Sequence, residues 1–321
     1  MRIVCLVENT EGKAGCGIEH GLCLYVETER HKLLLDTGAS ELFIKNAEIK
    51  GVDLTKVDTV VISHGHSDHG GGLEAFSRIN PTAKIYMQES AEGEYYSQHE
   101  PDQEAKYIGL APEAKDLPQI VRIHGNVTID EELSVFTCVS DERPIPSANR
   151  ALREKKEDCF VPDEFRHEQY LVIQEGNLQV LFSGCCHHGI RNVLAAYRKL
   201  YGRDPDDVIS GFHLLQRKGY SDEDVEEIVD TAHALKEFNT VFYTGHCTGE
   251  KPYEVMKGIM GDQLQYMHCG DEIKLNMKKV TELKPVIAGK KGSGGMKLHK
   301  FFAWATVGCF VMTMVTGYKH K

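Results

Sequence analysis

The stretch VVISHGHSDHGGGL at residues 60–73 decides the fold of this chain. Its apolar start, at residues 60–62, predicts a buried strand, and its three glycines let the backbone turn tightly before a helix begins. Between them, three imidazoles and one carboxylate fall within six positions: His64, His66, Asp68 and His69. Polar side chains at the end of a buried strand need a compensating partner.

These four side chains predict a metal centre. On a helix, His64 and His66 would point in divergent directions, but in a loop that leaves a strand both imidazoles can bind one ion. Asp68 and His69 can then turn towards a second ion. Three imidazoles and a carboxylate suit Zn²⁺, with Mn²⁺ or Fe²⁺ as competitors. The alternative is a histidine-rich surface loop, which would gain nothing from these ligands beside a buried strand.

Length and composition restrict the class of protein. With 321 residues the chain can bury a large core as one or two domains, and its stability needs no disulfides. Its ten cysteines include no CxxC pair, and its start, MRIVCLVENT, lacks the features of a secretory signal. Both observations favour free thiols in a reducing cytoplasm. The net charge of −11 argues against nucleic acid as the main partner.

The pattern of apolar residues predicts a layered α/β protein. Runs rich in Val, Leu and Ile that end in Gly, Asp or Asn indicate strands in the first half of the chain. Residues 168–184 predict a hairpin that turns at Gly176-Asn177. Helices are expected at 40–51, 190–202 and 221–239, the last with a capping box at its start. Residues 88–165 are less regular, and we interpret them as an insertion and candidate lid.

The C-terminal part differs in kind. We expect a domain over 1–285, a flexible linker over 286–296, and a hydrophobic helix over 297–321 with no charge from 301 to 318. This run is barely long enough to cross a bilayer, and lysines flank it. It predicts a membrane anchor that keeps the domain in the cytoplasm; a buried or interfacial helix is the alternative. The two histidines that bracket the run would lie about 30 Å apart on a helix, so one haem there would need ligands from a partner.

The HxHxDH pattern of His64, His66, Asp68 and His69 resembles the signature of the metallo-β-lactamase superfamily. His at position 66, where the iron-containing electron-transfer branch has Glu, is similar to the hydrolytic members. Further stretches, EHGLCLYVE, LLLDTGAS, YIGL, SGCCHHGIRNVL, GFHL and TGHCTG, occur in the order found in the subgroup of the archaeal dihydropterin-ribofuranosylaminobenzene phosphate synthase. The resemblance covers most of residues 1–285.

The resemblance implies an αββα sandwich with two metal ions in the cleft where the strands of both sheets end. It implies that His187 is the third ligand of the first ion and that His246 is the distant ligand of the second. Asp36, at a strand end, is then expected to orient a ligating histidine. His213 is a candidate substrate contact or proton donor, with a structural role as the equal alternative.

One position departs from the pattern. Superfamily hydrolases commonly carry a metal-bridging Asp after a Gly at a strand end, and here Gly184 is followed by Cys185. Either Cys185 is a soft ligand, or the bridge is missing and the second ion is held more loosely; we favour the second reading, with Cys185 outside direct ligation. His188 falls where the pattern is variable. Cys186 and Cys247 are expected to be packing residues.

The predicted function is a dinuclear, metal-dependent hydrolase. A metal-bound hydroxide, oriented by Asp68, would attack a small-molecule phosphodiester, lactone or thioester. Either His213 or a metal-bound water would protonate the leaving group. Three alternatives remain. One is a pterin-type condensing enzyme like the archaeal synthase, one an RNA-processing nuclease, and one a membrane-tethered redox or sensor protein whose metal site is not hydrolytic.

Overall fold

The computed structural model describes residues 1–12, 15–98, 104–137, 140 and 142–276. The chain divides into two compact units, Met1–Met277 and Lys278–Lys321. The expected linker at 286–296 and the expected hydrophobic helix at 297–321 both fall in the second unit, which lies outside the described residues. Within the described ranges, no helix has the length and apolar character needed to cross a membrane.

Two seven-stranded sheets form the centre of the first unit. The first has the order β18 (Glu272–Lys274), β1 (Arg2–Val7), β2 (Cys23–Glu27), β3 (Lys32–Leu35), β4 (Thr59–Val61), β5 (Lys84–Gln88) and β8 (Ile120–Ile123). The second has the order β17 (Leu264–Tyr266), β16 (Val241–Thr244), β15 (Asp207–Ile209), β14 (Leu178–Phe182), β13 (Tyr170–Glu175), β10 (Leu133–Phe136) and β9 (Val127–Thr128). In each sheet, parallel strands on one side continue into antiparallel strands on the other.

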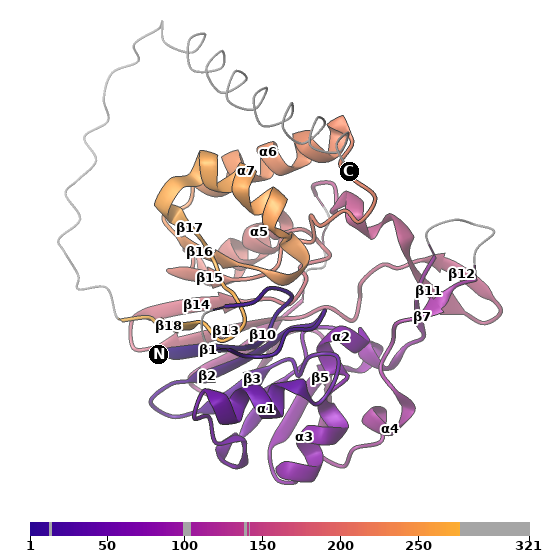
Figure 1. The fold of residues 1–321 in the computed structure, drawn as a ribbon, viewed down its shortest axis with the longest axis vertical. Helices are drawn as coiled ribbons and strands as arrows, with labels where there is room; N and C mark the ends of the chain where they lie inside the picture. The colour runs from indigo at the N-terminus through magenta and orange to yellow at the C-terminus, as the bar shows by residue number, and fades with distance from the viewer. Residues whose placement is uncertain (13–14, 99–103, 138–139, 141, 277–321) are drawn as a thin grey trace, which may run out of the picture. The chain divides into compact units, whose positions relative to one another are not determined.

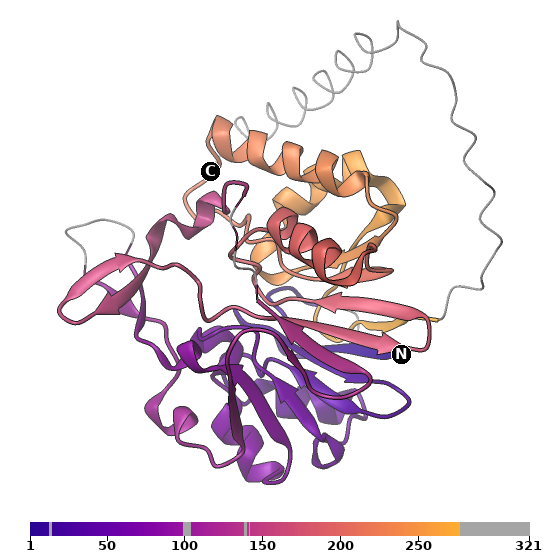
Figure 2. The same cartoon turned by 180° about the vertical axis from the view of Figure 1, so that it is seen from behind.

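Helices cover the outer face of each sheet (Figures 1 and 2). The first sheet carries α1 (Leu42–Ile49), α3 (Leu73–Ile79) and α4 (Pro112–Lys115); the second carries α5 (Ile190–Tyr201), α6 (Asp222–Lys236) and α7 (Glu250–Met260). Between the sheets, a buried cluster joins Ile3 and Val61 of the first to Phe182 of the second. Two further buried clusters lie on the outer faces, one between each sheet and the helices that cover it. The expected mixed α/β sandwich is confirmed.

Local sequence signals explain several of these elements. The hairpin predicted at Gly176-Asn177 is confirmed as β13 and β14, which pair antiparallel. Helix α5 ends at Gly202, whose φ of 68° lies in the left-handed region that glycine adopts without strain. Helix α6 begins with a capping box between Ser221 and Asp224, as predicted.

Residues 88–165, expected as an insertion, contribute to each of the three sheets in the described part of the chain. Strand β8 extends the first sheet by pairing with β5, and β10 extends the second by pairing with β13. Strand β9 pairs with β10 at the edge of the second sheet. What is added to the sandwich is a four-stranded sheet in the order β12 (Cys159–Pro162), β11 (Leu152–Lys156), β6 (Tyr95–Ser97) and β7 (Lys106–Tyr107). Its strands lie to one side of the two large sheets (Figure 1).

Candidate metal centre

The HxHxDH segment lies where β4 ends between the sheets. The sequence suggested a loop throughout, but a short helix, α2 (Ser67–Gly70), begins directly after His66 and carries Asp68 and His69. This tight turn needs glycine behind it. A Cβ atom at Gly71 would lie 2.3 Å from the carbonyl oxygen of Ala39, so the backbones approach too closely for a side chain.

Asp68, His69, Cys185 and His246 form one group, whose potential ligand atoms all lie within 4.8 Å of one another. Nε2 of His69 lies 3.2 Å from Nε2 of His246 and 3.2 Å from Sγ of Cys185. Oδ2 of Asp68 lies 3.5 Å from Nε2 of His246. The structure therefore brings together the residues expected at the second ion, and it adds Cys185 to them.

Asp36 orients His69 from behind. Its Oδ2 lies 2.7 Å from Nδ1 of His69, and it also accepts hydrogen bonds from the backbone N–H and the hydroxyl of Ser63. Burial opposes a charge on His69, but the carboxylates of Asp36 and Asp68 outweigh it and raise the pKa of His69 to about 9. Asp36 itself has a φ of 61°, a strained conformation for a residue with a side chain.

His64, Cys185 and His187 form a second group within the same distance limit. Nε2 of His64 lies 3.3 Å from Nε2 of His187. Burial, with the neighbouring imidazoles, holds the pKa of His64 and of His187 well below the ordinary value. Both rings are therefore neutral near pH 7, which is the form that binds a metal ion.

An asparagine clamps one histidine of each group in the same way. The Asn149 amide donates to the carbonyl oxygen of His187 at 2.8 Å, and its Oδ1 lies 2.8 Å from Nδ1 of the same ring. Asn9 makes the equivalent pair of contacts with His246, at 3.2 and 2.9 Å. Because the amide oxygen accepts from Nδ1–H, each Nε2 keeps its lone pair for a ligand.

His66 lies beside the His64–His187 pair and belongs to a third group of potential ligands. It falls in a group with Asp163 and His167, and its Nε2 lies 3.8 Å from Oδ2 of Asp163. Its ring lies edge-to-face against His64 and His187, with centroids 4.6 and 5.0 Å apart. Nε2 of His66 is buried and has no hydrogen-bond partner among the described residues. A buried imidazole nitrogen without a hydrogen-bond partner is the arrangement expected of a metal ligand.

The remaining residues singled out in the sequence are His213, His188, Cys186 and Cys247, and the structure gives them different surroundings. His213 faces the centre: its ring centroid lies 4.2 Å from that of His187, and its buried Nδ1 has no hydrogen-bond partner in the described part of the chain. His188 lies outside both groups, with Nε2 3.1 Å from the carbonyl oxygen of Phe165. Cys186 packs in the apolar cluster under α5. Sγ of Cys247 donates to the carbonyl oxygen of Cys185 at 3.4 Å.

Sequence reasoning missed several residues that position the site. Asn9 and Asn149 carry no motif, because a lone asparagine in a loop has no periodic signal. The segment Asp163–Glu168 was also missed, although acids and a histidine just before a buried strand are a usable signal. There, His167 lies 3.0 Å from Asp163, and Glu168 accepts the backbone N–H of His187 at 2.6 Å.

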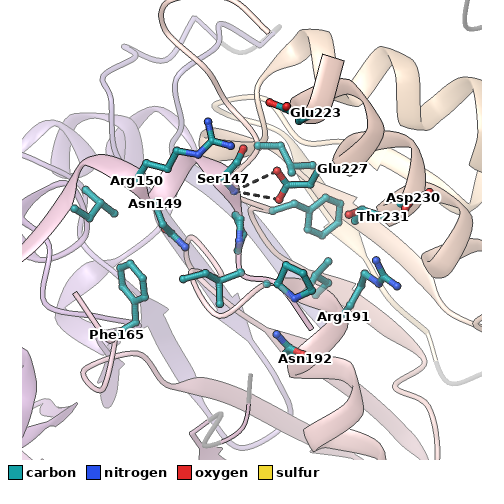
Figure 3. Close-up of a pocket in the computed structure, with 18 of the residues that line it drawn as sticks. Ser147, Asn149, Arg150, Phe165, Arg191, Asn192, Glu223, Glu227, Asp230 and Thr231 are labelled. Atoms are coloured by element: carbon teal, nitrogen blue, oxygen red, sulfur yellow. Dashed lines mark hydrogen bonds between the residues drawn. The ribbon is translucent and has the colours of Figure 1, made fainter. Parts of the chain in front are cut away.

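A cavity of about 660 Å³ adjoins the His64–His187 group. Asn149 and Phe165 line it, and the Phe165 ring stacks on His187 with centroids 4.6 Å apart. Figure 3 shows Glu223, Glu227 and Asp230 of α6 on one side of it. Arg191, near the start of α5, also lines the cavity, and its buried Nε has no hydrogen-bond partner among the described residues.

The donor set fits divalent ions. Imidazole nitrogens, one carboxylate and one thiol are the ligands that zinc takes in proteins, and the orienting contacts of Asp36, Asn9 and Asn149 lie directly behind them.

Comparison with known proteins agrees with this geometry. Residues 16–145 match the family model of the metallo-beta-lactamase superfamily. The 7,8-dihydropterin-6-methyl-4-(β-D-ribofuranosyl)-aminobenzene-5'-phosphate synthase of Methanocaldococcus jannaschii is 26% identical over 275 residues, covering 80% of this chain and 90% of that protein. An uncharacterized protein of the same organism is 27% identical over 274 residues, covering 84% and 98%. Tm1679, a metal-dependent hydrolase of the β-lactamase superfamily, has a TM-score of 0.72 at 27% identity, covering 86% of this chain and 99% of that one.

Proposed function

We propose, on the premise that this chain belongs to the metallo-β-lactamase superfamily, that it is a hydrolase of small ester-type molecules with two divalent metal ions, zinc by its donor set. The observation that supports this most directly is the pair of ligand groups that meet at Cys185 beside a cavity of about 660 Å³. A cavity of this size accommodates a small molecule.

The chain's own residues would divide the work. When bound, the two ions would supply an activated water and polarise the substrate's carbonyl or phosphoryl oxygen. Asp68 would orient the attacking water, because its carboxylate faces the ligand nitrogen of His246 at 3.5 Å. His213 would donate a proton to the leaving group, since its ring centroid lies 4.2 Å from that of His187 and its buried Nδ1 has no hydrogen-bond partner among the described residues.

The cavity wall indicates a substrate class. Arg191 lies at the start of α5, where no side chain among the described residues caps the helix. Its buried Nε has no hydrogen-bond partner there either, so the guanidinium can meet an anion. Among phosphodiesters, lactones and thioesters, this favours substrates that carry a phosphate or a carboxylate.

Metal analysis joined to a substrate screen tests the proposal. We expect two ions per wild-type chain and turnover of at least one chromogenic phosphodiester, lactone or thioester. Asp68→Asn should lose turnover. His187→Ala should lose one ion, because it removes a ligand of the His64–His187 group. Unchanged metal content in His187→Ala contradicts the ligand assignment, and no turnover of any ester class contradicts the hydrolase.

A pterin-type condensation is the second candidate, favoured by the synthase among the relatives. The metal-loaded protein used in the ester screen also distinguishes a hydrolase from a synthase. A chain that holds two ions, hydrolyses none of the esters, and joins a dihydropterin carrying a pyrophosphate leaving group to a ribofuranosyl-aminobenzene phosphate, with release of pyrophosphate, is a synthase. Stimulated cleavage of short RNA would instead indicate a nuclease, and a haem or redox-active iron spectrum would indicate a redox or sensor protein.

The membrane anchor at 301–318 is a separate proposal that rests on the uncharged run alone. We expect the full chain to sediment with the membranes when a cell lysate is centrifuged. We also expect it to resist extraction from those membranes with alkaline carbonate. Full release by carbonate contradicts an anchor.

A further inference from the structure

Cys185 is the member that the two ligand groups share. Its Sγ lies within 4.8 Å of the ligand atoms of His64 and His187, and within the same limit of those of Asp68, His69 and His246. We infer that the Cys185 thiolate bridges the two metal ions, in the place where a carboxylate bridge is missing from this chain. This inference rests on the proposed two-ion site and reverses the reading favoured from the sequence, which left Cys185 outside direct ligation.

The backbone delivers this sulfur to the centre by close packing. Cys185 follows β14 and is 3% exposed. At Gly184, a Cβ would lie 2.1 Å from Oγ of Ser63 and 3.2 Å from Oδ2 of Asp36, so only glycine lets this turn rest on the residues behind the site. On the other side, Cys247 donates to the Cys185 carbonyl, and Gly211 leaves room for that thiol. The position of Cys185 is therefore fixed from both sides.

Cys247 is a neighbouring thiol to which we assign no metal, and its contacts differ from those of Cys185. It is also buried, but in the described part of the chain it groups with Cys185 and His213 alone, and its S–H is used in the hydrogen bond to the Cys185 carbonyl. Sγ of Cys185, by contrast, faces Nε2 of His69 at 3.2 Å. A thiol that faces several imidazole nitrogens is the arrangement expected of a ligand.

Metal binding would replace the thiol proton of Cys185. On metal binding the S–H bond breaks, the proton leaves to solvent, and the electron pair stays on Sγ, where it is shared between the ions. The thiolate adds a second negative charge beside Asp68, which offsets part of the charge of two divalent ions. Because a thiolate is a soft ligand, the site should prefer Zn²⁺ or Co²⁺ to Mn²⁺.

Cobalt substitution of the full chain tests the bridge without any substrate. We expect a sulfur-to-cobalt charge-transfer band in the near ultraviolet that changes with both the first and the second equivalent of Co²⁺, because each ion meets the same sulfur. Cys247→Ser, the matched control, should keep the band. Cys185→Ser should lose it. Cys185→Asp, which restores a carboxylate, should bind two ions without the band.

Three results would overturn the bridge: a band that survives in Cys185→Ser, a band lost in Cys247→Ser, or a wild-type band complete after one equivalent although two ions bind. If Cys185→Ser fails to fold, Cys185→Asp and Cys247→Ser still decide the question. Two bound Co²⁺ ions without a band reject the bridge and leave the hydrolase proposal standing. A band that spans both equivalents in a protein without ester turnover rejects the hydrolase and leaves the bridge standing.

Discussion

Oδ2 of Asp36 lies 2.7 Å from Nδ1 of His69, and this contact decides which nitrogen of the imidazole faces Cys185 and His246. Asp36 is fully buried and held in turn by Ser63. The carboxylate therefore fixes the orientation of the ring before any ion arrives. Preorganised ligands lose less conformational entropy on binding, so the contact contributes to metal affinity from outside the ligand set.

Replacing Asp36 should weaken metal binding without removing a ligand. We expect Asp36→Asn to lower the affinity for one of the two ions by about 10–100-fold, because a neutral amide accepts from Nδ1–H less strongly. Competition with a chromophoric chelator measures this. The matched control is Asp58→Asn: Asp58 also meets an imidazole, Nδ1 of His31, at 2.8 Å, but lies outside the site. Equal losses in both variants would show a general effect of removing charge.

The metal-free protein should be most stable near pH 6.5. The pKa of His69 is raised from 6.5 to about 9 in the fold, so the unfolded chain loses its proton first, and this contribution disappears as pH rises from 6.5 through 9. His64 and His187 have lowered pKa values, so below 6.5 only the unfolded chain binds these protons, and stability falls there too.

Urea denaturation of chelator-treated protein across this range provides the measurement. The alkaline decline should amount to at most ~3 kcal/mol. Asp36→Asn should flatten it, because the raised pKa of His69 depends on Asp36. A wild-type curve that keeps rising from pH 6.5 to 9 contradicts the assignment.

Local patterns in the sequence predicted much of the fold and only part of the site. The hairpin before Gly184 and the capping box at Ser221 follow from short-range rules, and the structure has both. The orienting residues do not, because they meet their partners across long stretches of chain: Asn9 contacts His246 across 237 positions. Nor does a single sequence show that His66 turns towards Asp163, since that depends on side-chain packing in three dimensions.

Because of the close packing at Gly184, an alanine there should destabilise the fold, whereas an alanine at Gly258 should not. Gly184→Ala places a Cβ 2.1 Å from Oγ of Ser63, so we expect a loss of about 1–3 kcal/mol and weaker binding of both ions. At Gly258, inside helix α7, no atom lies within 4 Å of the position that a Cβ would take, so Gly258→Ala should be neutral or stabilising by about 0.4–1 kcal/mol. Thermal melts of the two variants test this, and a Gly184→Ala protein as stable as wild type would show that the turn can move away.

Arg191 should act on substrate affinity rather than on the chemical step. Its Nε is buried in the cavity wall and has no hydrogen-bond partner among the described residues, so an anionic group of a ligand can satisfy it. Losing one charge-assisted hydrogen bond should raise KM for an anionic ester by about ten-fold, with kcat nearly unchanged.

Two comparisons make the Arg191 prediction specific. Arg191→Met should also weaken inhibition by inorganic phosphate, while its KM for an uncharged lactone stays at the wild-type value, because that substrate offers no anion to the guanidinium. Arg203→Met is the control, since Arg203 pairs with Asp206 on the surface and does not line the cavity. If Arg191→Met instead lowers kcat for charged and uncharged substrates alike, the guanidinium supports the metal centre and does not select the substrate.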